Sequence, residues 1–515
     1  MLCIKLRLRI GSSTVVLVAI GLAMACIWAR NVEAASLRAG VAVRNITADA
    51  PAKQVRDPLY AKALVLDDGS TKAVIICVDI GAASGALVSE VRQRVQEELS
   101  INQKNVLLNA SHNHNTWNQT ARDMAGRIVQ AVEQAASTMV PVKIGVGAGY
   151  EDQISMSRRL RLKDGKEWTI RRANPSPQDS EVVGLGPMDT EIGILRLDKV
   201  GGGTLVVLYN FALHAYGGVP DGGVTADLPG FASSVIEEAM GPGAVALFVQ
   251  GAAGDITPIR YKDFDAPPPT ERLGMMLGIS VITAAKGLPM KEQGGIKVVS
   301  EIVELPGRQD IAVRIESLEN RQEEILQFFT GIGCGAHGAG TSLNFKSFLP
   351  LYIKHSIDPN YPSYSSYLYL REQMTDREDL KHLDAVNKKR VGKYLECIYK
   401  MEELIRLRTN LQILKGHLRE DDSRPLVVEI QGIRVGDFVL VTFPGELFAE
   451  VGLRLKKQSP FPHTFIAAYS NGNIGYAPTA DVYGSEAYED ALTRLGPQWQ
   501  QLYETKALAI IGKLQ

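Results

Sequence analysis

The sequence predicts an α/β fold in which mixed β-sheets are flanked by helices, and three observations lead to this prediction. Short apolar runs alternate with segments whose apolar residues recur at helical spacing, which is typical of α/β proteins. Residues that can bind a metal stand at the ends of several apolar runs. The stretch 311–420 is instead rich in Glu, Lys, Arg and Leu at helical spacing, which predicts a mostly helical insertion.

Strands and helices alternate most clearly in the first part of the chain. The segment 84–99 begins with Ser and has helical spacing, and 121–139 has the same spacing. A further helix is expected at 231–240. Apolar runs predict strands at 39–43, 64–66, 73–78, 106–108, 142–149, 204–211 and 244–249.

The second part of the chain begins with the helical stretch. Two long helices, at 311–329 and 377–415, are expected to pack as an antiparallel hairpin around an irregular segment at 331–369. The elements predicted after them are strands at 426–433 and 437–443, a helix at 447–457, a strand at 464–468 and a final helix at 486–514.

Composition describes an ordinary globular protein that is large enough for several domains. Of the 515 residues, 45% are hydrophobic and 22% are charged, and the formal net charge is −1. This balance gives no indication of nucleic acid as a partner.

The N-terminal segment, residues 1–35, has the pattern of a signal peptide or membrane anchor. Lys5, Arg7 and Arg9 are followed by an uncharged apolar run at 10–29 and by small residues around Ala34. The run is also long enough to span a bilayer, so both alternatives stay open. Either one predicts an exported protein that is periplasmic, secreted or anchored facing outside.

Cysteines and glycosylation sequons say little about the fold or the function. Beyond the leader, Cys77, Cys334 and Cys397 are too few for a disulfide framework, although one bridge can form. The glycosylation sequon occurs at Asn45, Asn109 and Asn118.

Candidate metal ligands follow three predicted strands. His112 and His114 stand two residues apart in a polar turn, His214 follows the strand at 204–211, and Glu446 follows the strand at 437–443. Residues i and i+2 of an extended segment point to the same side, so both histidines of the turn can reach one site. A catalytic zinc usually has three such ligands and a water molecule, whose pKa it lowers. The alternatives are a solvated loop and a hydrogen-bonded core histidine.

Two further segments could contribute to such a site. Residues 157–161 carry Arg158 and Arg159, which are either solvated or available to stabilise an oxyanion. The small-residue turn 250–258 follows a buried strand and either lets a ligand approach closely or is a plain connection.

Five motifs in order resemble the catalytic N-terminal domain of the neutral/alkaline non-lysosomal ceramidase family. They are Asn-Ala-Ser-His-Asn-His, Asn-Phe-Ala-Leu-His, Gly-Ala-Ala-Gly-Asp-Ile-Thr-Pro, Phe-Pro-Gly-Glu and Ser-Asn-Gly-Asn-Ile-Gly-Tyr. The resemblance covers 37–310 and 425–490. It implies a divergent member without the family's C-terminal immunoglobulin-like domain, with a catalytic domain at 36–310 and 421–515 and the insertion at 311–420.

The resemblance also implies an activity and a set of site residues. Members are zinc-dependent amidases of sphingolipid metabolism that cleave the N-acyl bond of ceramide, which predicts a lipid or small N-acyl substrate, about one Zn²⁺ per chain and contact with a membrane surface. The implied Zn²⁺ ligands are His112, His214, Glu446 and Tyr476. The implied catalytic residues are His114 and Arg158 (or Arg159) for the oxyanion, Thr257 at a serine position, and Tyr488, with Tyr483 nearby, for the substrate.

The chain also departs from the family pattern. Asn115-Thr116-Trp117 replaces Ser-Gly-Pro after the histidine pair, and Thr257 adds a methyl group to the expected hydroxyl. These departures keep two alternatives open, a hydrolase of another acylated sugar or lipid and a non-catalytic binding protein with the same fold.

Overall fold

The structure is a computed structural model of the chain. It describes residues 37–116, 119–170, 177, 179–218, 223–258, 270–332, 345–359, 378–420, 423–485 and 487–515. The predicted signal peptide or anchor therefore lies outside the described residues. The chain divides into two compact units. The first comprises the described residues up to Leu305, Leu426–Tyr483 and Pro497–Gln515, and the second comprises Pro306–Pro425 and Gly484–Gly496.

A large mixed sheet of eight strands forms the centre of the first unit, in the order β12-β11-β10-β5-β1-β2-β3-β4. Most neighbours are antiparallel, but β3/β4 and β11/β12 are parallel. Its strands are β1 (Arg38–Asn45), β2 (Tyr60–Asp67), β3 (Lys72–Val78), β4 (Val106–Ala110), β5 (Val140–Tyr150), β10 (Glu191–Lys199), β11 (Thr204–Phe211) and β12 (Val245–Gln250).

A second sheet packs face to face against the first. Its strands, in spatial order, are β14 (Ile296–Leu305), β15 (Leu426–Val435), β16 (Phe438–Thr442) and β18 (His463–Ala467). The apolar side chains between the sheets, such as Leu208, Leu247, Leu440 and Phe465, form one buried cluster. Strands such as β11 are buried along their whole length and therefore on both faces, which accounts for the continuous apolar runs in the sequence.

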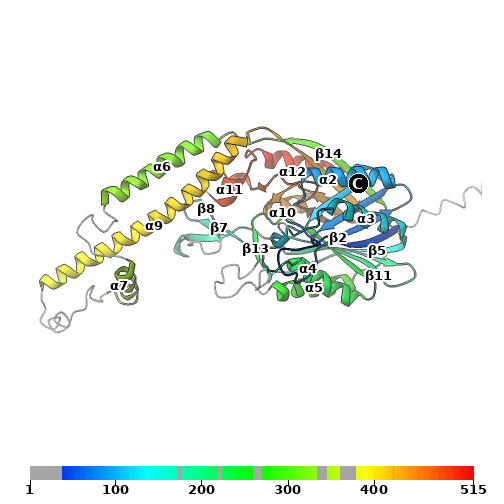
Figure 1. Cartoon of the computed structure of the whole chain (residues 1–515), viewed down its shortest axis with the longest axis horizontal. Helices are drawn as coiled ribbons and strands as arrows, with labels where there is room; N and C mark the ends of the chain where they lie inside the picture. Colours follow the sequence, from blue (N-terminus) through cyan, green and yellow to red (C-terminus); the bar gives the residue numbers. More distant parts are fainter. Residues whose placement is uncertain are drawn as a thin grey trace, which may run out of the picture. The chain divides into compact units, whose positions relative to one another are not determined.

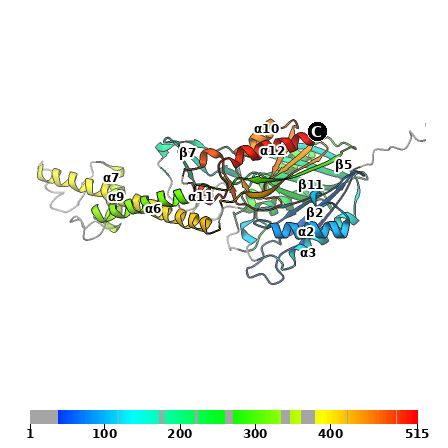
Figure 2. The same ribbon diagram turned by 90° about the horizontal axis from the view of Figure 1, so that it is seen from above.

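Helices cover both outer faces, which gives α/β/β/α layers (Figures 1 and 2). On the large sheet, α4 (Asp227–Met240) and α5 (Thr270–Lys286) pack against β10 to β12, and α3 (Met124–Ser137) packs against β1 and β2 with α2 (Gly85–Leu99) beside it. On the small sheet, α10 (Ala449–Gln458) and α12 (Trp499–Lys513) form the other layer. The α/β prediction is confirmed.

Three short pairings beside the sheets carry predicted site residues. They are β6 (Ser155–Ser157) with β13 (Ile256–Pro258), β17 (Glu446–Leu447) with β19 (Tyr476–Ala477), and β7 (Arg159–Leu162) between β8 (Glu167–Thr169) and β9 (Val182–Leu185). In the register of the first two, Thr257 is opposite Met156 and Glu446 is opposite Tyr476. Backbone pairing therefore fixes Thr257, Glu446 and Tyr476 at defined positions.

The second unit is largely helical, with α6 (Ile311–Ile332), α7 (Phe345–Ile357), α9 (Glu378–Glu420) and α11 (Tyr488–Leu492). Ile315, Leu318 and Ile325 of α6 form an apolar core with residues 407–414 of α9. Glu319 pairs with Lys415 at 2.5 Å, and Arg321 pairs with Glu403 at 2.7 Å. These contacts make α6 and α9 an antiparallel pair.

Some details differ from the sequence prediction. The final helix expected at 486–514 is two helices, α11 and α12, because Gly496 and Pro497 interrupt it and Pro cannot donate a helical hydrogen bond. Strand β10 and helix α5 are absent from the prediction.

Asn45 is exposed, but the sequon residue Asn109 is fully buried, and Asn118 lies outside the described residues. Within the described part of the chain, every helix is too short or too polar to cross a bilayer.

Candidate metal centre

The histidine turn owes its shape to one left-handed residue. Strand β4 ends at Ala110, and His112 then has φ 56°, outside the extended region. Backbone hydrogen bonds hold the turn, from Ser111 to Val78 O (3.0 Å), from Asn113 to Ile80 O (3.1 Å) and from His114 to Ala215 O (3.0 Å). His112 and His114 thus reach one place through a tight turn and not through the extended geometry that the sequence argument assumed.

Three imidazole rings converge at this turn. The Nε2 atoms of His112, His114 and His214 lie 3.1 Å from one another in all three pairs. Nδ1 of His112 is 2.8 Å from Gly81 O, and Nδ1 of His214 is 3.3 Å from Ala253 O. A proton on each of these Nδ1 atoms leaves the Nε2 lone pairs directed at each other.

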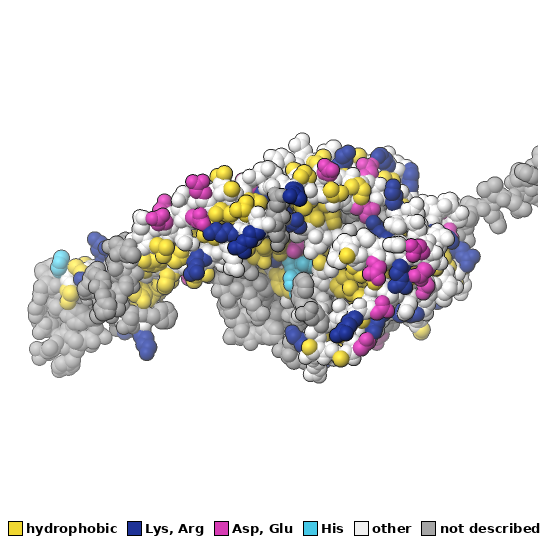
Figure 3. All heavy atoms as spheres, turned by 45° about the horizontal axis from the view of Figure 1, so that its top comes forward, with side chains coloured by type: hydrophobic (Ala, Val, Ile, Leu, Met, Phe, Trp, Pro, Cys, Tyr) yellow, Lys and Arg dark blue, Asp and Glu magenta, His cyan; other side chains and the backbone are white. Residues whose placement is uncertain are grey.

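This arrangement fits a metal ion. Lone pairs that face each other at this distance repel unless a cation lies between them, and metal-binding histidines usually donate their other N–H to a carbonyl or carboxylate. Among the described residues, these three histidines form the group of His, Cys, Asp and Glu whose ligand atoms could hold a metal ion. His112 and His214 are buried and His114 is exposed, and histidine comes to the surface in the face shown in Figure 3.

The electrostatic environment keeps two of these rings neutral. Desolvation, the neighbouring His112 and Arg158 lower the pKa of His114 to about 4, with Glu446 opposing them. Desolvation, His112, Arg158 and His114 hold the pKa of His214 well below its usual value. Neutral imidazole coordinates a metal through one ring nitrogen, so His214 can bind at neutral pH, and a neutral His114 keeps one ring N–H to donate.

Glu446 and Tyr476 lie beside the histidines. Glu446 Oε2 is 3.5 Å from His112 Nε2, and this largely buried oxygen has no hydrogen-bond partner among the described residues. Burial by itself would raise the pKa of Glu446, but His112, Arg158 and a hydrogen bond with Tyr476 lower it below its usual value. A buried carboxylate with an unpartnered oxygen also fits a missing cation.

The structure distinguishes the two arginines that the sequence left open. Arg158 Nη2 donates to Gly254 O at 2.8 Å and to Tyr476 Oη at 3.1 Å, which places Arg158 at the site. Arg159 is buried elsewhere, where it binds Glu167 at 2.6 and 2.5 Å and Asp255 at 3.3 Å. Arg158 is therefore available for charge stabilisation, whereas Arg159 holds neighbouring segments together.

Two tyrosines of the site were missed in the sequence. The Tyr216 ring lies 4.3 Å from His214 and 5.6 Å from His114, and its hydroxyl is 2.5 Å from Thr257 Oγ1. The Tyr469 ring lies 4.1 Å from His112. Tyr216 comes two residues after His214, and Tyr469 directly precedes the motif that ends at Tyr476. Their closeness to these motifs in the sequence was the signal that could have identified both tyrosines.

The remaining predicted residues are Tyr488, Tyr483 and those of the turn that follows His114. Tyr488 begins α11 and belongs to the second unit, so its substrate contact stays a prediction, and Tyr483 ends the segment Leu426–Tyr483 of the first unit. Asn115, where the family pattern is lost, donates at 2.6 Å to the buried carboxylate of Asp227. The departure thus has a structural function. Trp117 lies outside the described residues.

The fold is similar to that of solved ceramidase structures. The crystal structure of neutral ceramidase from Pseudomonas aeruginosa matches with a TM-score of 0.58 at 17% identity, over 93% of this chain and 75% of that one. A ceramidase complexed with C2 matches with a TM-score of 0.60 at 16% identity, with the same coverage. At these identities the likeness shows the fold.

Sequence comparison gives a shorter match. Neutral ceramidase from Pseudomonas aeruginosa is 26% identical over 126 residues, which are 22% of this chain and 19% of that protein. The match thus spans about a fifth of the curated relative. No protein-family model matches the chain.

Proposed function

We propose that this chain is an exported zinc-dependent amidohydrolase that cleaves an N-acyl bond, as a divergent relative of the ceramidases. The observation that carries the proposal is the cluster of three Nε2 atoms at 3.1 Å beside the unpartnered carboxylate oxygen of Glu446. His112, His214, Glu446 and Tyr476 would hold the Zn²⁺, about one ion per chain. A bound Zn²⁺ would supply a Lewis acid that polarises a carbonyl and lowers the pKa of water.

The side chains around the cluster have the properties that amide hydrolysis needs. Hydrogen bonds to Tyr476 and Gly254 hold the positively charged Arg158 side chain in place, and His114 is the exposed member of the cluster. Both would donate to the oxygen of the substrate carbonyl as negative charge develops on it. Thr257 keeps a hydroxyl at the predicted serine position and would hold the substrate. Tyr488 is proposed to contact the substrate as well.

A lipid N-acyl compound is the favoured substrate. The support is the fold, which this chain shares with neutral ceramidase and with a ceramidase complexed with C2. The departures at Asn115 and Thr257 favour retaining two alternatives, another acylated sugar or lipid and a binding protein without activity. The proposed division is a catalytic domain at 36–310 and 421–515 with an insertion at 311–420, and the protein would meet its substrate at a membrane surface.

Export is supported by the N-terminal pattern at 1–35 and by a disulfide at Cys397. Disulfides persist in oxidising compartments and are rare in the cytosol. Fractionation of cells that express the full chain tests this, with a periplasmic, secreted or membrane-bound outward-facing protein expected. Recovery from the cytosol would overturn it.

The central test is a panel of N-acyl substrates assayed with and without a chelator. Ceramides of several acyl lengths, N-acyl amino sugars and O-acyl lipids should be offered to protein whose zinc content has been measured. The expected result is amide cleavage that the chelator abolishes and added Zn²⁺ restores. Binding of an N-acyl lipid without turnover would favour the non-catalytic alternative, and cleavage of O-acyl lipids alone would exclude an amidase.

A further inference from the structure

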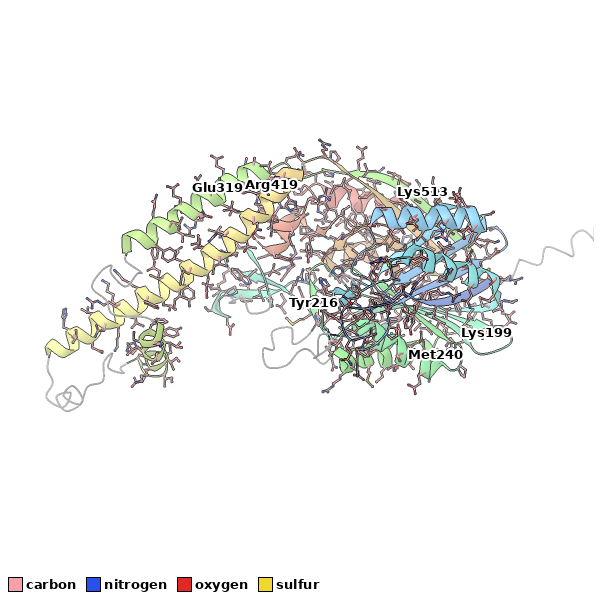
Figure 4. The ribbon with its side chains drawn as sticks, in the orientation of Figure 1. Lys199, Tyr216, Met240, Glu319, Arg419 and Lys513 are labelled. Atoms are coloured by element: carbon pink, nitrogen blue, oxygen red, sulfur yellow. The ribbon has the colours of Figure 1, made fainter. Side chains whose placement is uncertain are left out.

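Tyr216 contacts three residues of the candidate centre. Its ring is T-shaped to His214, with 4.3 Å between the ring centroids and 77° between the planes, and to His114, with 5.6 Å and 72°. Its hydroxyl lies 2.5 Å from Oγ1 of the fully buried Thr257. Figure 4 labels Tyr216, which lies apart from Lys199 at the end of β10. One side chain therefore connects two histidines to the hydroxyl that stands at the predicted serine position.

The backbone around Tyr216 is held on both sides. Its own N–H donates to His214 O at 3.0 Å, and Ala215 O accepts from His114 N at 3.0 Å. Gly218, with φ 66°, donates to Asp227 Oδ2 at 2.8 Å. A Cβ at this glycine would lie 3.2 Å from Asn115 Oδ1, so the loop leaves little space here. The ring of Tyr216 is thus directed by the same loop that carries His214.

The direction of the Thr257 hydroxyl depends on Tyr216. It is buried in strand β13, where pairing with β6 fixes its backbone. A phenol is more acidic than an aliphatic hydroxyl, so Tyr216 is the better donor of the pair. When Tyr216 donates to Oγ1, the proton of the Thr257 hydroxyl has a long contact to Pro258 O at 3.5 Å, which a substrate acceptor can replace. The branched Thr257 side chain has few rotamers, so this hydrogen bond selects its direction.

We propose that Tyr216 is a positioning residue with two roles. Its ring braces His214 and His114 so that their Nε2 atoms stay together, and its hydroxyl orients Thr257 toward the bound substrate. The role of the hydroxyl rests on the proposed amidohydrolase function. The role of the ring does not, because it concerns only metal binding by the histidines.

Competition with a chromophoric chelator for Zn²⁺ tests the ring. Tyr216→Ala should weaken zinc binding about tenfold or more, as expected for loss of a residue that orients ligands. Tyr216→Phe should stay within about twofold of the wild type, because it keeps the ring. Tyr150→Ala is the matched control, since Tyr150 is 71% exposed at the end of β5.

Wild-type zinc affinity in Tyr216→Ala would overturn the role of the ring, and so would equal losses in Tyr216→Ala and Tyr216→Phe. If Tyr216→Ala does not fold, Tyr216→Leu replaces it, because leucine fills part of the space without an aromatic ring. The same outcomes then apply to Tyr216→Leu.

A double-mutant cycle on kcat/KM tests the hydroxyl. Tyr216→Phe and Thr257→Val should each lower kcat/KM about tenfold for the best N-acyl substrate, and the double variant should lose about tenfold and not about 100-fold. Thr257→Ser, which keeps the hydroxyl, should recover most of the kcat/KM that Thr257→Val loses. Multiplicative losses, or unchanged kcat/KM in Tyr216→Phe, would overturn this role.

Unfolding measurements separate function from structure. Coupling of Tyr216 and Thr257 that occurs in the urea midpoint but not in kcat/KM would mean that the hydrogen bond only stabilises the fold, which overturns the proposed orientation of Thr257. A wild-type protein that binds zinc but cleaves no amide would overturn the proposed function and the hydroxyl's part in it. The zinc competition would still decide whether the ring braces the histidines.

Discussion

His112 Nε2 lies 3.1 Å from His214 Nε2, although 102 positions separate the two residues in the chain. The turn after β4 and the loop after β11 bring them together, and each ring is held from behind by a backbone carbonyl at its Nδ1. Two imidazole nitrogens without protons would not remain this close without a cation.

Zinc content is the first prediction from this pair. Purified wild-type protein should contain about one zinc per chain, and His112→Ala and His214→Ala should each reduce it to background, because each removes a proposed ligand. Elemental analysis measures the metal, and circular dichroism shows whether the variants fold. His382→Ala is the control, since His382 is exposed on α9. Equal zinc in all four proteins would refute a site at these histidines.

Arg158 and Arg159 should respond differently to substitution. Arg159→Ala removes the buried cation that pairs with Glu167 and Asp255 and should cost about 3–5 kcal/mol of the free energy of unfolding. Arg158→Ala should cost less of the free energy of unfolding than Arg159→Ala and should lower kcat about 100-fold, because Arg158 is the proposed donor for the oxyanion. Urea unfolding and steady-state kinetics measure the two effects. A reversal of this pattern would contradict the assignment of Arg158 to the site.

Asn109 should be critical for stability. Its Nδ2 donates to Ala468 O at 2.6 Å and to Ser470 Oγ at 3.0 Å, and its Oδ1 accepts from Gln250 N at 2.9 Å. Asn109→Ala leaves buried groups unpaired and should cost about 3 kcal/mol in urea unfolding.

Asn105→Ala provides the comparison for Asn109→Ala. Its hydrogen bond to Lys72 O is exposed, so its loss should cost less than about 1 kcal/mol. Equal costs for the two variants would show that Asn109 does not tie the strands together.

Asp79 should make stability depend on pH. Burial raises the pKa of Asp79 from 3.8 to about 6, with Lys62 and a hydrogen bond from the Tyr60 amide opposing the shift. The folded state therefore prefers the protonated carboxyl. The stability that Asp79 contributes is complete below about pH 4, is lost as the pH rises to about 6, and is constant above.

Asp79→Asn tests this dependence. The amide oxygen can still accept from Tyr60 N, and the variant cannot ionise. Relative to the wild type, its free energy of unfolding should rise by on the order of 2 kcal/mol between pH 4.5 and pH 7.5. Urea unfolding at both pH values gives the difference. A difference that is constant with pH, or that shrinks at pH 7.5, would contradict the raised pKa.

The sequence by itself determined the fold class and the places where functional residues could stand. Strands β3, β4, β11 and β12 are apolar along their length, and Ser84 caps α2, because both signals come from burial and hydrogen bonding of neighbouring residues. For the same reason the sequence could put His112, His214 and Glu446 just beyond strands. It could not show that these positions meet.

Tertiary structure decided which of these residues form one site. Sheet order brings the turn after β4 to the loop after β11, and pairing of β17 with β19 adds Glu446 and Tyr476. The choice of Arg158 over Arg159 and the contact of Tyr216 with Thr257 depend on side chains from distant segments. Sequence periodicity reports which face of an element is buried, whereas a site depends on which elements become neighbours, and that follows only from packing the whole sheet.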